Sequence, residues 1–431
     1  MQDKPPPHPN LRVVLYDDSP VYGGHEVMTL LGLDGLLRAG ARVLFVYATE
    51  NGKLGEALVK LQRSHAGLEI CPQAPPSRKL QGVLNHLQRR SIARLAEMFQ
   101  RFNADVVLCA QGDLELSSRG VLAGRRAGIR TVSYIPFAHT QAQMGAKFGA
   151  LRDPFNGYLL NAPDAFITIS LEAAQHFRHR GTRVPVDVVY NGVDIGRFGG
   201  DRREARRKLG LPEQAWVVAL CGRLEVKQKG QLLLLEALQR SPWLREHTRI
   251  LLVGDGPDEA LLRQTAEAAG LTPCVAFTGW CDTKTVYPAL DALVIASRFE
   301  GMPLVMLEAL VSGVPVVASD RDGMRELLPR DWRFRPGDAA ALAEVLRAVL
   351  QSDCTDVLKK IGVPHRASDV GRGIPTQLHR TLVSPRSRSF GSINRAKRCR
   401  HCSAGFLTPR LTASFTGAGG FSGCTTFAPL A

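Results

Sequence analysis

Short apolar runs that alternate with helical patterns constrain this chain more than any other feature. Each run spans four to six residues and is bounded by turn residues, which is typical of buried parallel strands joined by crossover helices. Two series are evident. We expect strands of the first series at 11–16, 42–47, 105–109, 130–134, 165–169 and 186–190, and of the second at 216–221, 249–253, 274–277, 291–295 and 314–317.

A turn-rich stretch separates the two series. Residues 191–200 read Asn-Gly-Val-Asp-Ile-Gly-Arg-Phe-Gly-Gly, a composition that suits a hinge. With 431 residues the chain is long enough for two substantial cores. The sequence therefore predicts an α/β protein with two Rossmann-like domains facing a central cleft, an N-terminal domain over 1–190 and a C-terminal domain over 191–350.

The end of the chain departs from this pattern. Of the formal net charge of +15, +9 lies in residues 352–431, which contain 12 Lys and Arg against 3 acids. Apolar periodicity is absent after Leu350, and Arg, Ser, Thr, Gly and Pro dominate. Such a segment buries too little apolar area to offset the entropy lost on ordering. We predict that 351–431 is an atypical basic tail, either disordered or the product of a reading-frame shift.

Two carboxylates eight positions apart mark a candidate site in the second series. Glu300 and Glu308 flank a Gly-Met-Pro turn and lie between two apolar runs, so a helix that begins just after Glu300 places Glu308 near its own opening. In such strand, loop, helix, strand units, ligands bind outside the carboxyl ends of the strands, and a helix N-terminus offers N–H groups to a phosphate. The two acids are thus predicted to grip one extended ligand.

Cations follow the first strand of the second series. The loop Cys-Gly-Arg-Leu-Glu-Val-Lys-Gln-Lys-Gly contains Arg223 and Lys229, which would hold a diphosphate and ease its departure as a leaving group. Exposed loop cations are the alternative, but the two acids at an equivalent strand end favour the functional interpretation. The turn Gly-Asp-Gly-Pro at 254–257 has a structural and a ligand-binding interpretation, and both stay open.

These motifs together resemble glycosyltransferase family 4, the retaining enzymes of GT-B fold. The resemblance is carried by Phe-Glu-Gly-Met-Pro-Leu with Leu-Glu-Ala, by Gly-Arg-Leu and Lys-Gly after the strand at 216–221, by Gly-Asp-Gly-Pro, and by Asn-Gly-Val-Asp. It runs from about Leu11 to Leu350 and is strongest in the second domain. The fold expected from it is GT-B, with the acceptor bound by the first domain and the nucleotide sugar by the second.

The resemblance implies roles for particular residues. Glu300 would contact the donor sugar, Glu308 would hold the ribose hydroxyls, and Arg223 and Lys229 would bind the diphosphate. The other residues that we place at the donor site are Gly301, Met302, Pro303 and Leu304 of the turn, and Gly23 and Gly24 of a first-domain loop whose glycines permit close approach.

A first-domain histidine also takes part in catalysis in many family members, and the candidate is His139, just past a strand end. A histidine there can instead cap or pack locally. The resemblance further implies that no metal and no cofactor are needed, because Arg223, Lys229 and helix N-termini replace the divalent ion. Retention of the anomeric configuration is expected through front-face departure of the nucleotide diphosphate beside Glu300.

The expected function is that of a glycosyltransferase of the hexosyltransferase type, as in polysaccharide biosynthesis, acting on a glycan, lipid-linked or small-molecule acceptor. Family members usually end with a helix that crosses back onto the first domain, and nothing after Leu350 has its periodicity. An inactive nucleotide-sugar-binding protein therefore stays an alternative. A nucleic-acid-binding protein that acts through the basic tail is a weaker one, and no specific nucleic acid is expected.

The expected cellular location depends on two sequence features, membrane-spanning apolar runs and secretory signals. No apolar run approaches the length needed to span a bilayer, and the opening residues lack the apolar core of a secretory signal, so a cytoplasmic location is expected. Residues 77–102 form one amphipathic helical pattern whose polar side is rich in Arg and Lys. It is either a crossover helix with a solvated basic face or, over 78–102, a peripheral contact with the inner face of the membrane.

Overall fold

Two separate parallel sheets organise the chain in the computed structural model, which describes residues 10–73 and 75–361. These residues all belong to one structural unit. The sequence prediction for the basic tail lies outside the described residues from 362 onward.

The first sheet has seven strands in the order β3-β2-β1-β4-β5-β6-β7, and every pairing is parallel. The strands are β1 (Arg12–Asp17), β2 (Arg42–Ala48), β3 (Leu68–Gln73), β4 (Val106–Ala110), β5 (Arg130–Tyr134), β6 (Ala165–Thr168) and β7 (Val186–Val188).

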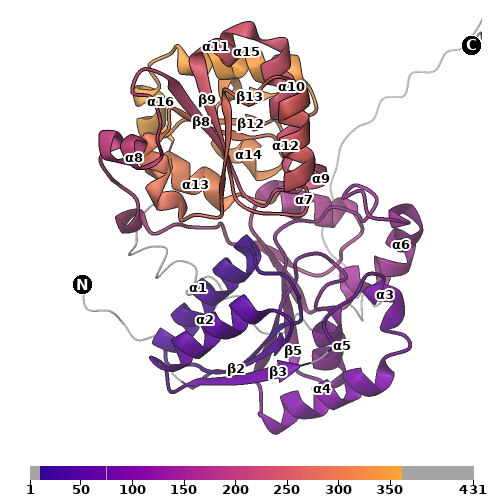
Figure 1. The fold of residues 1–431 in the computed structure, drawn as a ribbon. Coiled ribbons are helices and arrows are strands. Elements are labelled where there is room, and N and C mark those ends of the chain that lie inside the picture. The colour runs from indigo at the N-terminus through magenta and orange to yellow at the C-terminus, as the bar shows by residue number, and fades with distance from the viewer. Residues whose placement is uncertain (1–9, 74, 362–431) are drawn as a thin grey trace, which may run out of the picture. The chain divides into compact units, whose positions relative to one another are not determined.

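The helices of this half are α1 (Gly24–Arg38), α2 (Gly52–Gln62), α3 (Gln81–Leu84), α4 (Arg89–Arg101), α5 (Ser118–Arg126), α6 (Gly149–Asn156) and α7 (Leu171–His179), with a 3-10 helix at Gly157–Asn161. Alternate side chains of β1 point to opposite faces of the sheet. Val13 and Leu15 pack with α1 and α2, whereas Val14 and Tyr16 pack with α4 and α5. Helices therefore cover both faces, as Figure 1 shows, which is why the strands are apolar on both sides.

The second sheet has six parallel strands in the order β10-β9-β8-β11-β12-β13. They are β8 (Trp216–Cys221), β9 (Thr248–Val253), β10 (Val275–Gly279), β11 (Ala292–Ile295), β12 (Val316–Ser319) and β13 (Arg333–Phe334).

The helices of this half are α8 (Arg202–Lys208), α9 (Val226–Lys229), α10 (Gln231–Arg240), α11 (Pro242–His247), α12 (Glu259–Ala268), α13 (Leu304–Val311), α14 (Asp322–Leu327), α15 (Ala339–Leu350) and α16 (Thr355–Lys360). Short 3-10 helices lie at Ile195–Arg197, Thr283–Thr285, Tyr287–Ala289 and Arg330–Trp332.

Both sheets have the doubly wound topology of parallel α/β folds. In each, the first strand lies in the interior of the sheet, and the strand order reverses direction beside it, between β1 and β4 and between β8 and β11. Ligands of doubly wound sheets bind outside the carboxyl ends of the strands at this point. The sequence prediction of an α/β protein with two parallel sheets is confirmed.

Three details differ from the sequence prediction. Strand β3 was not predicted, because it is an edge strand that contains Glu69 and Pro72 and is only partly buried. Strand β13 was not predicted either, because it has only two residues. Helix α16 lies beyond Leu350, where the sequence showed no pattern, and Val357 and Leu358 pack against the second core.

The single helical pattern over 77–102 is wrong. The structure breaks it into α3 and α4, with turns between them and with Leu80 in a left-handed conformation at φ 68°. Leu95 and Phe99 of α4 are buried against the first sheet, whereas Leu80 and Leu87 are exposed. The crossover-helix interpretation therefore describes α4 alone.

Candidate active site

The strand-order reversal of the second sheet brings Lys229 and Glu300 together. Lys229 ends α9, which follows β8, and Glu300 lies in the loop after the neighbouring strand β11. Lys229 Nζ lies 2.6 Å from Glu300 Oε1, and Ser297 Oγ donates a hydrogen bond of 2.8 Å to the same oxygen. Glu300 is 8% exposed, so its charge depends on these two partners.

Glycines let the loops after β8 and β9 touch. Gly222 and Gly254 have φ values of 141° and 134°, and a Cβ on Gly254 would collide with the carbonyl oxygen of Gly222. This close approach requires glycine, which supports a packing role for the turn at 254–257. The adjacent Arg223 is about half exposed, and its Nε lies 3.7 Å from Glu225 Oε2. An exposed pair of this length is weak, so the guanidinium is available to a ligand.

Glu308 lies in its own hydrogen-bond cluster on α13. Its Oε2 accepts hydrogen bonds of 2.8 Å from Tyr287 Oη and 3.0 Å from Thr283 Oγ1. Burial raises the pKa of Tyr287, and the neighbouring carboxylate of Glu308 raises it further, so the hydroxyl keeps its proton and acts as a donor. Burial also raises the pKa of Cys221, with a smaller contribution from Glu308. Glu308 therefore lies within electrostatic reach of the end of β8, where the loop with Arg223 begins.

The turn after Glu300 contacts loops of the first half of the chain. A Cβ on Gly301 would lie 2.6 Å from Pro136 O and 2.7 Å from Ile169 Cδ1, too close for any side chain. The carbonyl oxygen of Met302 accepts a hydrogen bond of 2.8 Å from Asn191 Nδ2. The turn is thus fixed by first-domain and hinge residues as well as by its own strand.

The other turn residues and the glycine loop also meet. Pro303 precedes the first residue of α13, Leu304, and a Cβ on Gly24 would lie 3.6 Å from Leu304 Cδ1. Gly23 donates its N–H to Glu26 Oε2 at 2.7 Å and so caps α1. The structure therefore places the first-domain glycine loop beside the turn that follows Glu300, and the donor-binding role of both stays a prediction.

His139 is linked to Glu300 through Asp322. His139 Nε2 lies 3.1 Å from Asp322 Oδ1, within ion-pair distance but without the alignment of a hydrogen bond. Asp322 Oδ2 accepts a hydrogen bond of 2.8 Å from the backbone N–H of Glu300. Both His139 and Asp322 are buried, at 6% and 4% exposed. Asp322 has φ 51°, a left-handed conformation that is costly for a residue other than glycine and often marks a functional position.

Several residues of this network were not among the predicted site residues. Asp322 and Ser297 contact Glu300, whereas Tyr287 and Thr283 contact Glu308. Ser297 lies three positions before Glu300, and this short spacing after a strand was the one available signal. The other three are first residues of helices that lie far from Glu300 or Glu308 in the sequence, and no local pattern reveals such contacts.

Two groups of side chains among the described residues could offer ligands to a metal. They are His139, His176 and Asp322, and Asp17, His25 and Glu26, with ligand atoms within 4.8 Å of one another in each group. Both oxygens of Asp322 already contact His139 and the Glu300 N–H. Burial and the charge of Glu26 raise the pKa of Asp17, which favours the protonated form that cannot bind a metal. The prediction that catalysis needs no metal stays a prediction.

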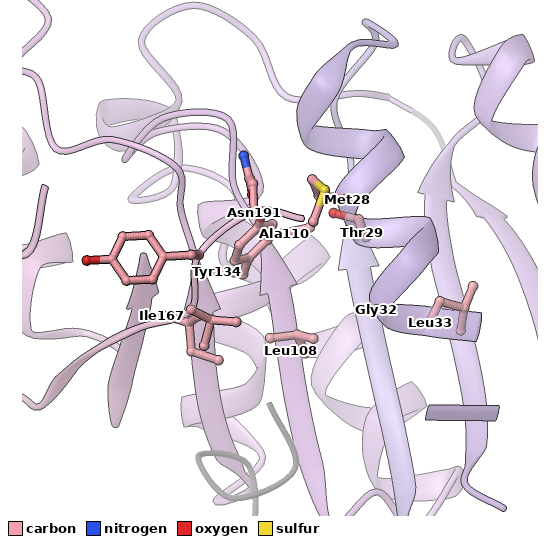
Figure 2. A pocket seen from close by; sticks show the side chains of 11 residues that line it. Met28, Thr29, Gly32, Leu33, Leu108, Ala110, Tyr134, Ile167 and Asn191 are labelled. Atoms are coloured by element: carbon pink, nitrogen blue, oxygen red, sulfur yellow. The ribbon is translucent and has the colours of Figure 1, made fainter. Parts of the chain in front are cut away.

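A small cavity lies beside this region in the first domain. It has a volume of about 30 Å³ and is lined mainly by apolar side chains of α1 and the central strands. Figure 2 shows Met28 and Thr29 on one side and Tyr134 and Asn191 on the other. This volume is about that of one water molecule, so the cavity cannot hold a sugar nucleotide.

Comparison with known families agrees with this geometry. The model of "Glycosyltransferase Family 4" matches residues 22–197, and the model of "Glycosyl transferases group 1" matches residues 215–352. Together the two matches cover well over half of the chain. The chain belongs to glycosyltransferase family 4.

Relatives of this glycosyltransferase family share segments of the chain. A D-inositol 3-phosphate glycosyltransferase of Actinosynnema mirum is 38% identical over 150 residues, which cover 32% of this chain and 36% of the relative. The putative teichuronic acid biosynthesis glycosyltransferase TuaC of Bacillus subtilis is 33% identical over 163 residues, which cover 36% of this chain and 39% of the relative. The chain thus spans little more than a third of the length of these curated relatives.

Solved structures match over a longer range. Anabaena HepE, crystallised with UDP and glucose, has a TM-score of 0.68 at 22% identity and covers 87% of this chain and 100% of its own. Sucrose-phosphate synthase of Thermosynechococcus elongatus has a TM-score of 0.67 at 19% identity and covers 86% of this chain and 99% of its own. At these identities the similarity concerns the fold, and the predicted GT-B fold is confirmed.

Proposed function

We propose that this protein transfers a sugar from a nucleotide-diphosphate donor to a glycan, lipid-linked or small-molecule acceptor, with retention of configuration and without a metal. The observation that carries the proposal is the Lys229–Glu300 ion pair of 2.6 Å at the strand-order reversal of the second sheet. A partly buried cation beside a buried acid at this point suits a ligand with a negative and a hydroxyl-rich end. Relatives named as glycosyltransferases support the reaction class.

The ion pair explains how the donor would be held. Without a donor, Lys229 balances the charge of Glu300. A diphosphate would compete for Lys229 and recruit the half-exposed Arg223, with further N–H groups offered by the start of α13. Glu300, freed in part from Lys229, would then accept hydrogen bonds from sugar hydroxyls. Glu308, whose carboxylate is oriented by Tyr287, would accept hydrogen bonds from the ribose hydroxyls.

The same residues account for a retaining reaction. The bond between the anomeric carbon and the phosphate oxygen breaks, and the electron pair leaves with the nucleotide diphosphate. The acceptor oxygen attacks the face from which the diphosphate departs, and its proton passes to a phosphate oxygen. Arg223 and Lys229 would stabilise the charge that develops on the phosphate, and Glu300 would stabilise the positive charge on the sugar ring.

Two structural features support the acceptor side and the absence of a metal. The loop with His139 reaches the donor half through Asp322, and this contact supports a role in which His139 would contact the sugar or acceptor. The cations Arg223 and Lys229 offer the positive charge that a divalent ion would otherwise supply. Among the solved structures, HepE was crystallised with UDP-glucose, and a UDP-sugar is the first donor to test here.

Peripheral membrane contact belongs to the same proposal. Among the described residues, none of the helices has the length and hydrophobicity needed to cross a bilayer. The basic stretch over 78–102 has exposed Arg and Lys side chains, and such a surface is attracted to anionic lipids. A lipid-linked acceptor would be reached from there.

The donor can be identified by thermal shift of the full chain with UDP-, GDP- and ADP-sugars, followed by release of the nucleotide diphosphate. We expect one nucleotide class to raise the unfolding temperature, because a ligand that binds only the folded state stabilises it. Glu300→Gln should abolish donor hydrolysis yet still bind the nucleotide diphosphate, since Lys229 is then free of its acid. A chain that neither binds nor hydrolyses any of these donors would contradict the proposal.

A further inference from the structure

Six large apolar side chains in the first half of the chain are exposed to solvent, although an apolar pattern normally predicts burial. Leu87 is 80% exposed, Leu151 67%, Phe155 64% and Phe148 62%. Leu80 and Val83 are exposed at 42% and 39%. We call these six residues the α3–α6 patch, because they lie on or beside those two helices. Clusters of large exposed apolar side chains usually mark an interaction surface.

The two helices lie side by side. Tyr158 Oη, just after α6, donates a hydrogen bond of 2.8 Å to the carbonyl oxygen of Gly82 in α3 and accepts one of 3.1 Å from Asn85 Nδ2. A Cβ on Gly82 would collide with Asn156 Oδ1. Figure 1 shows α3 and α6 adjacent at the margin of the first half. The exposed side chains of both helices therefore form one surface.

Helix α6 is amphipathic with its apolar side outward. Its inward side carries Arg152, whose Nη2 lies 2.5 Å from Glu115 Oε2, and Asn156, whose Nδ2 donates 2.6 Å to Glu115 Oε1. Arg152 and Glu115 are both buried. Phe148, Leu151 and Phe155 recur at the spacing of one helix face, and this face is exposed. A helix that buries Arg152 and exposes Leu151 and Phe155 presents an apolar face to a partner.

The charge around the patch is positive. Exposed cations flank it, namely Arg78, Lys79, Arg89, Arg90 and Lys147, and Lys147 Nζ lies 5.4 Å from the centroid of the Phe148 ring. The stretches 78–94 and 143–158 contain a single acid, Asp153. Its carboxylate already accepts the backbone N–H groups of Gln141 and Ala142. An apolar surface with exposed cations next to its residues in the sequence fits the interface of an anionic bilayer.

We propose that the α3–α6 patch is the membrane-docking surface of this protein, with the side chains of Leu87, Leu151 and Phe155 inserted among anionic lipids. The inference rests on the membrane contact proposed above. It differs in that the apolar α3–α6 patch, rather than the basic face of α4, makes the contact. The segment between His139 and α6 is short, and its Gln141 N–H is bonded to Asp153 of α6 at 2.7 Å. The patch thus lies on the acceptor side, where a lipid-borne acceptor would arrive.

Binding of the full chain to vesicles tests the proposal. We expect co-sedimentation with vesicles of phosphatidylcholine and phosphatidylglycerol, weakened by salt, and little with phosphatidylcholine alone. The double variant Leu87→Gln, Phe155→Gln should bind at least about tenfold more weakly, because two large apolar side chains no longer insert. Trp280→Gln is the matched control, since Trp280 is 72% exposed in the second half of the chain, and it should bind as the unchanged protein does.

A fluorescence measurement gives a second readout. In the variant Phe155→Trp, we expect tryptophan emission to shift to shorter wavelength when anionic vesicles are added, because the ring enters an apolar environment. Equal vesicle binding by the double variant and the unchanged protein would overturn the proposal, and so would a Phe155→Trp emission that does not shift. A change from dimer to monomer in the double variant, seen by light scattering, would also overturn it and would assign the patch to a second copy.

Donor hydrolysis in the absence of vesicles separates this inference from the proposed function. The double variant should hydrolyse the nucleotide sugar at the unchanged rate, because none of the patch residues contacts the Lys229–Glu300 pair. If the unchanged protein binds vesicles but hydrolyses no donor, the glycosyltransferase proposal fails and the docking surface stands. If it hydrolyses a donor but binds no anionic vesicles, the docking surface fails alone.

Discussion

Replacement of Asp322 tests whether the site works as one connected unit. Asp322 Oδ2 accepts the Glu300 N–H at 2.8 Å, and Oδ1 faces His139 Nε2 at 3.1 Å. The residue is buried and left-handed, with φ 51°. The variant Asp322→Asn keeps the size of the side chain, and asparagine tolerates this backbone conformation. It removes the charge that His139 and the Glu300 N–H face, and with it the contact of 3.3 Å between Arg321 Nε and Asp322 Oδ2.

The magnitude follows from these contacts. A hydrogen bond to a charged acceptor contributes about 1 kcal/mol more than one to a neutral acceptor, so Asp322→Asn should lower the free energy of unfolding by about 1 kcal/mol. The effect on the reaction should be larger, because a shift of about 1 Å in a catalytic group can cost about 10²-fold in rate. We expect kcat for donor hydrolysis to fall about 10²-fold, with KM for the donor changed about twofold or less.

The assay is steady-state release of the nucleotide diphosphate, combined with a double-mutant cycle against His139→Gln. If Asp322 acts by positioning His139 and Glu300, the two substitutions should be strongly non-additive. Asp320→Asn is the matched control, because Asp320 is 41% exposed in its side chain and pairs with Arg333 instead. A kcat that is unchanged in Asp322→Asn, or effects that simply add, would refute the reasoning.

Three further predictions concern packing, charge burial and pH. Gly301→Ala should lower both the unfolding temperature and kcat, because the added Cβ would lie 2.6 Å from the carbonyl oxygen of Pro136. Gly52→Ala is the control and should change neither, because a Cβ there meets no atom within 4 Å. Equal unfolding temperatures of the two variants would contradict the close approach at Gly301. Arg119→Met should cost about 3–5 kcal/mol in urea unfolding, since it leaves Asp18, its partner at 2.7 Å, buried without a cation; a cost below about 1 kcal/mol would contradict this. Burial raises the pKa of Asp17 well above its usual value, so the folded state keeps a proton that the unfolded state loses above about pH 3.9. The free energy of unfolding should therefore fall as pH rises from about 3.9 toward the raised pKa of the folded state. Asp17→Asn should flatten this dependence of stability on pH, and an unchanged dependence would exclude Asp17 as its source.

Much of the fold could be predicted because strand signals in this chain are local. The interior strands of both series are buried apolar runs covered by helices on both faces, and this pattern is visible without tertiary information. Edge strand β3 and the two-residue β13 have no such pattern, because their neighbours and not their own residues define them. Helices α3 and α4 were predicted as one helix, because Leu80 and Leu87 fit the helical period of the apolar residues. In the structure both side chains are exposed.

The site also contains residues with a local sequence signal and residues without one. Glu300 and Lys229 could be predicted, because each follows a recognisable strand and carries a motif. The contacts of Asp322 with Glu300 and of Tyr287 with Glu308 join residues 22 and 21 positions apart, and they depend on how distant loops meet. Gly301 was predicted to bind the donor, but the structure also shows a packing reason for glycine there, since Pro136 and Ile169 leave no room for a side chain.

Turnover of a nucleotide sugar by the full chain and by Glu300→Gln tests the central claim most directly. The unchanged protein, given the donor selected by thermal shift, should release the nucleotide diphosphate, and Glu300→Gln should do so at least about 10²-fold more slowly. The variant should still bind the nucleotide diphosphate, because Lys229 loses its acidic partner at 2.6 Å and stays available to phosphate. Turnover that survives Glu300→Gln, or its absence with every donor in the unchanged protein, would contradict the account.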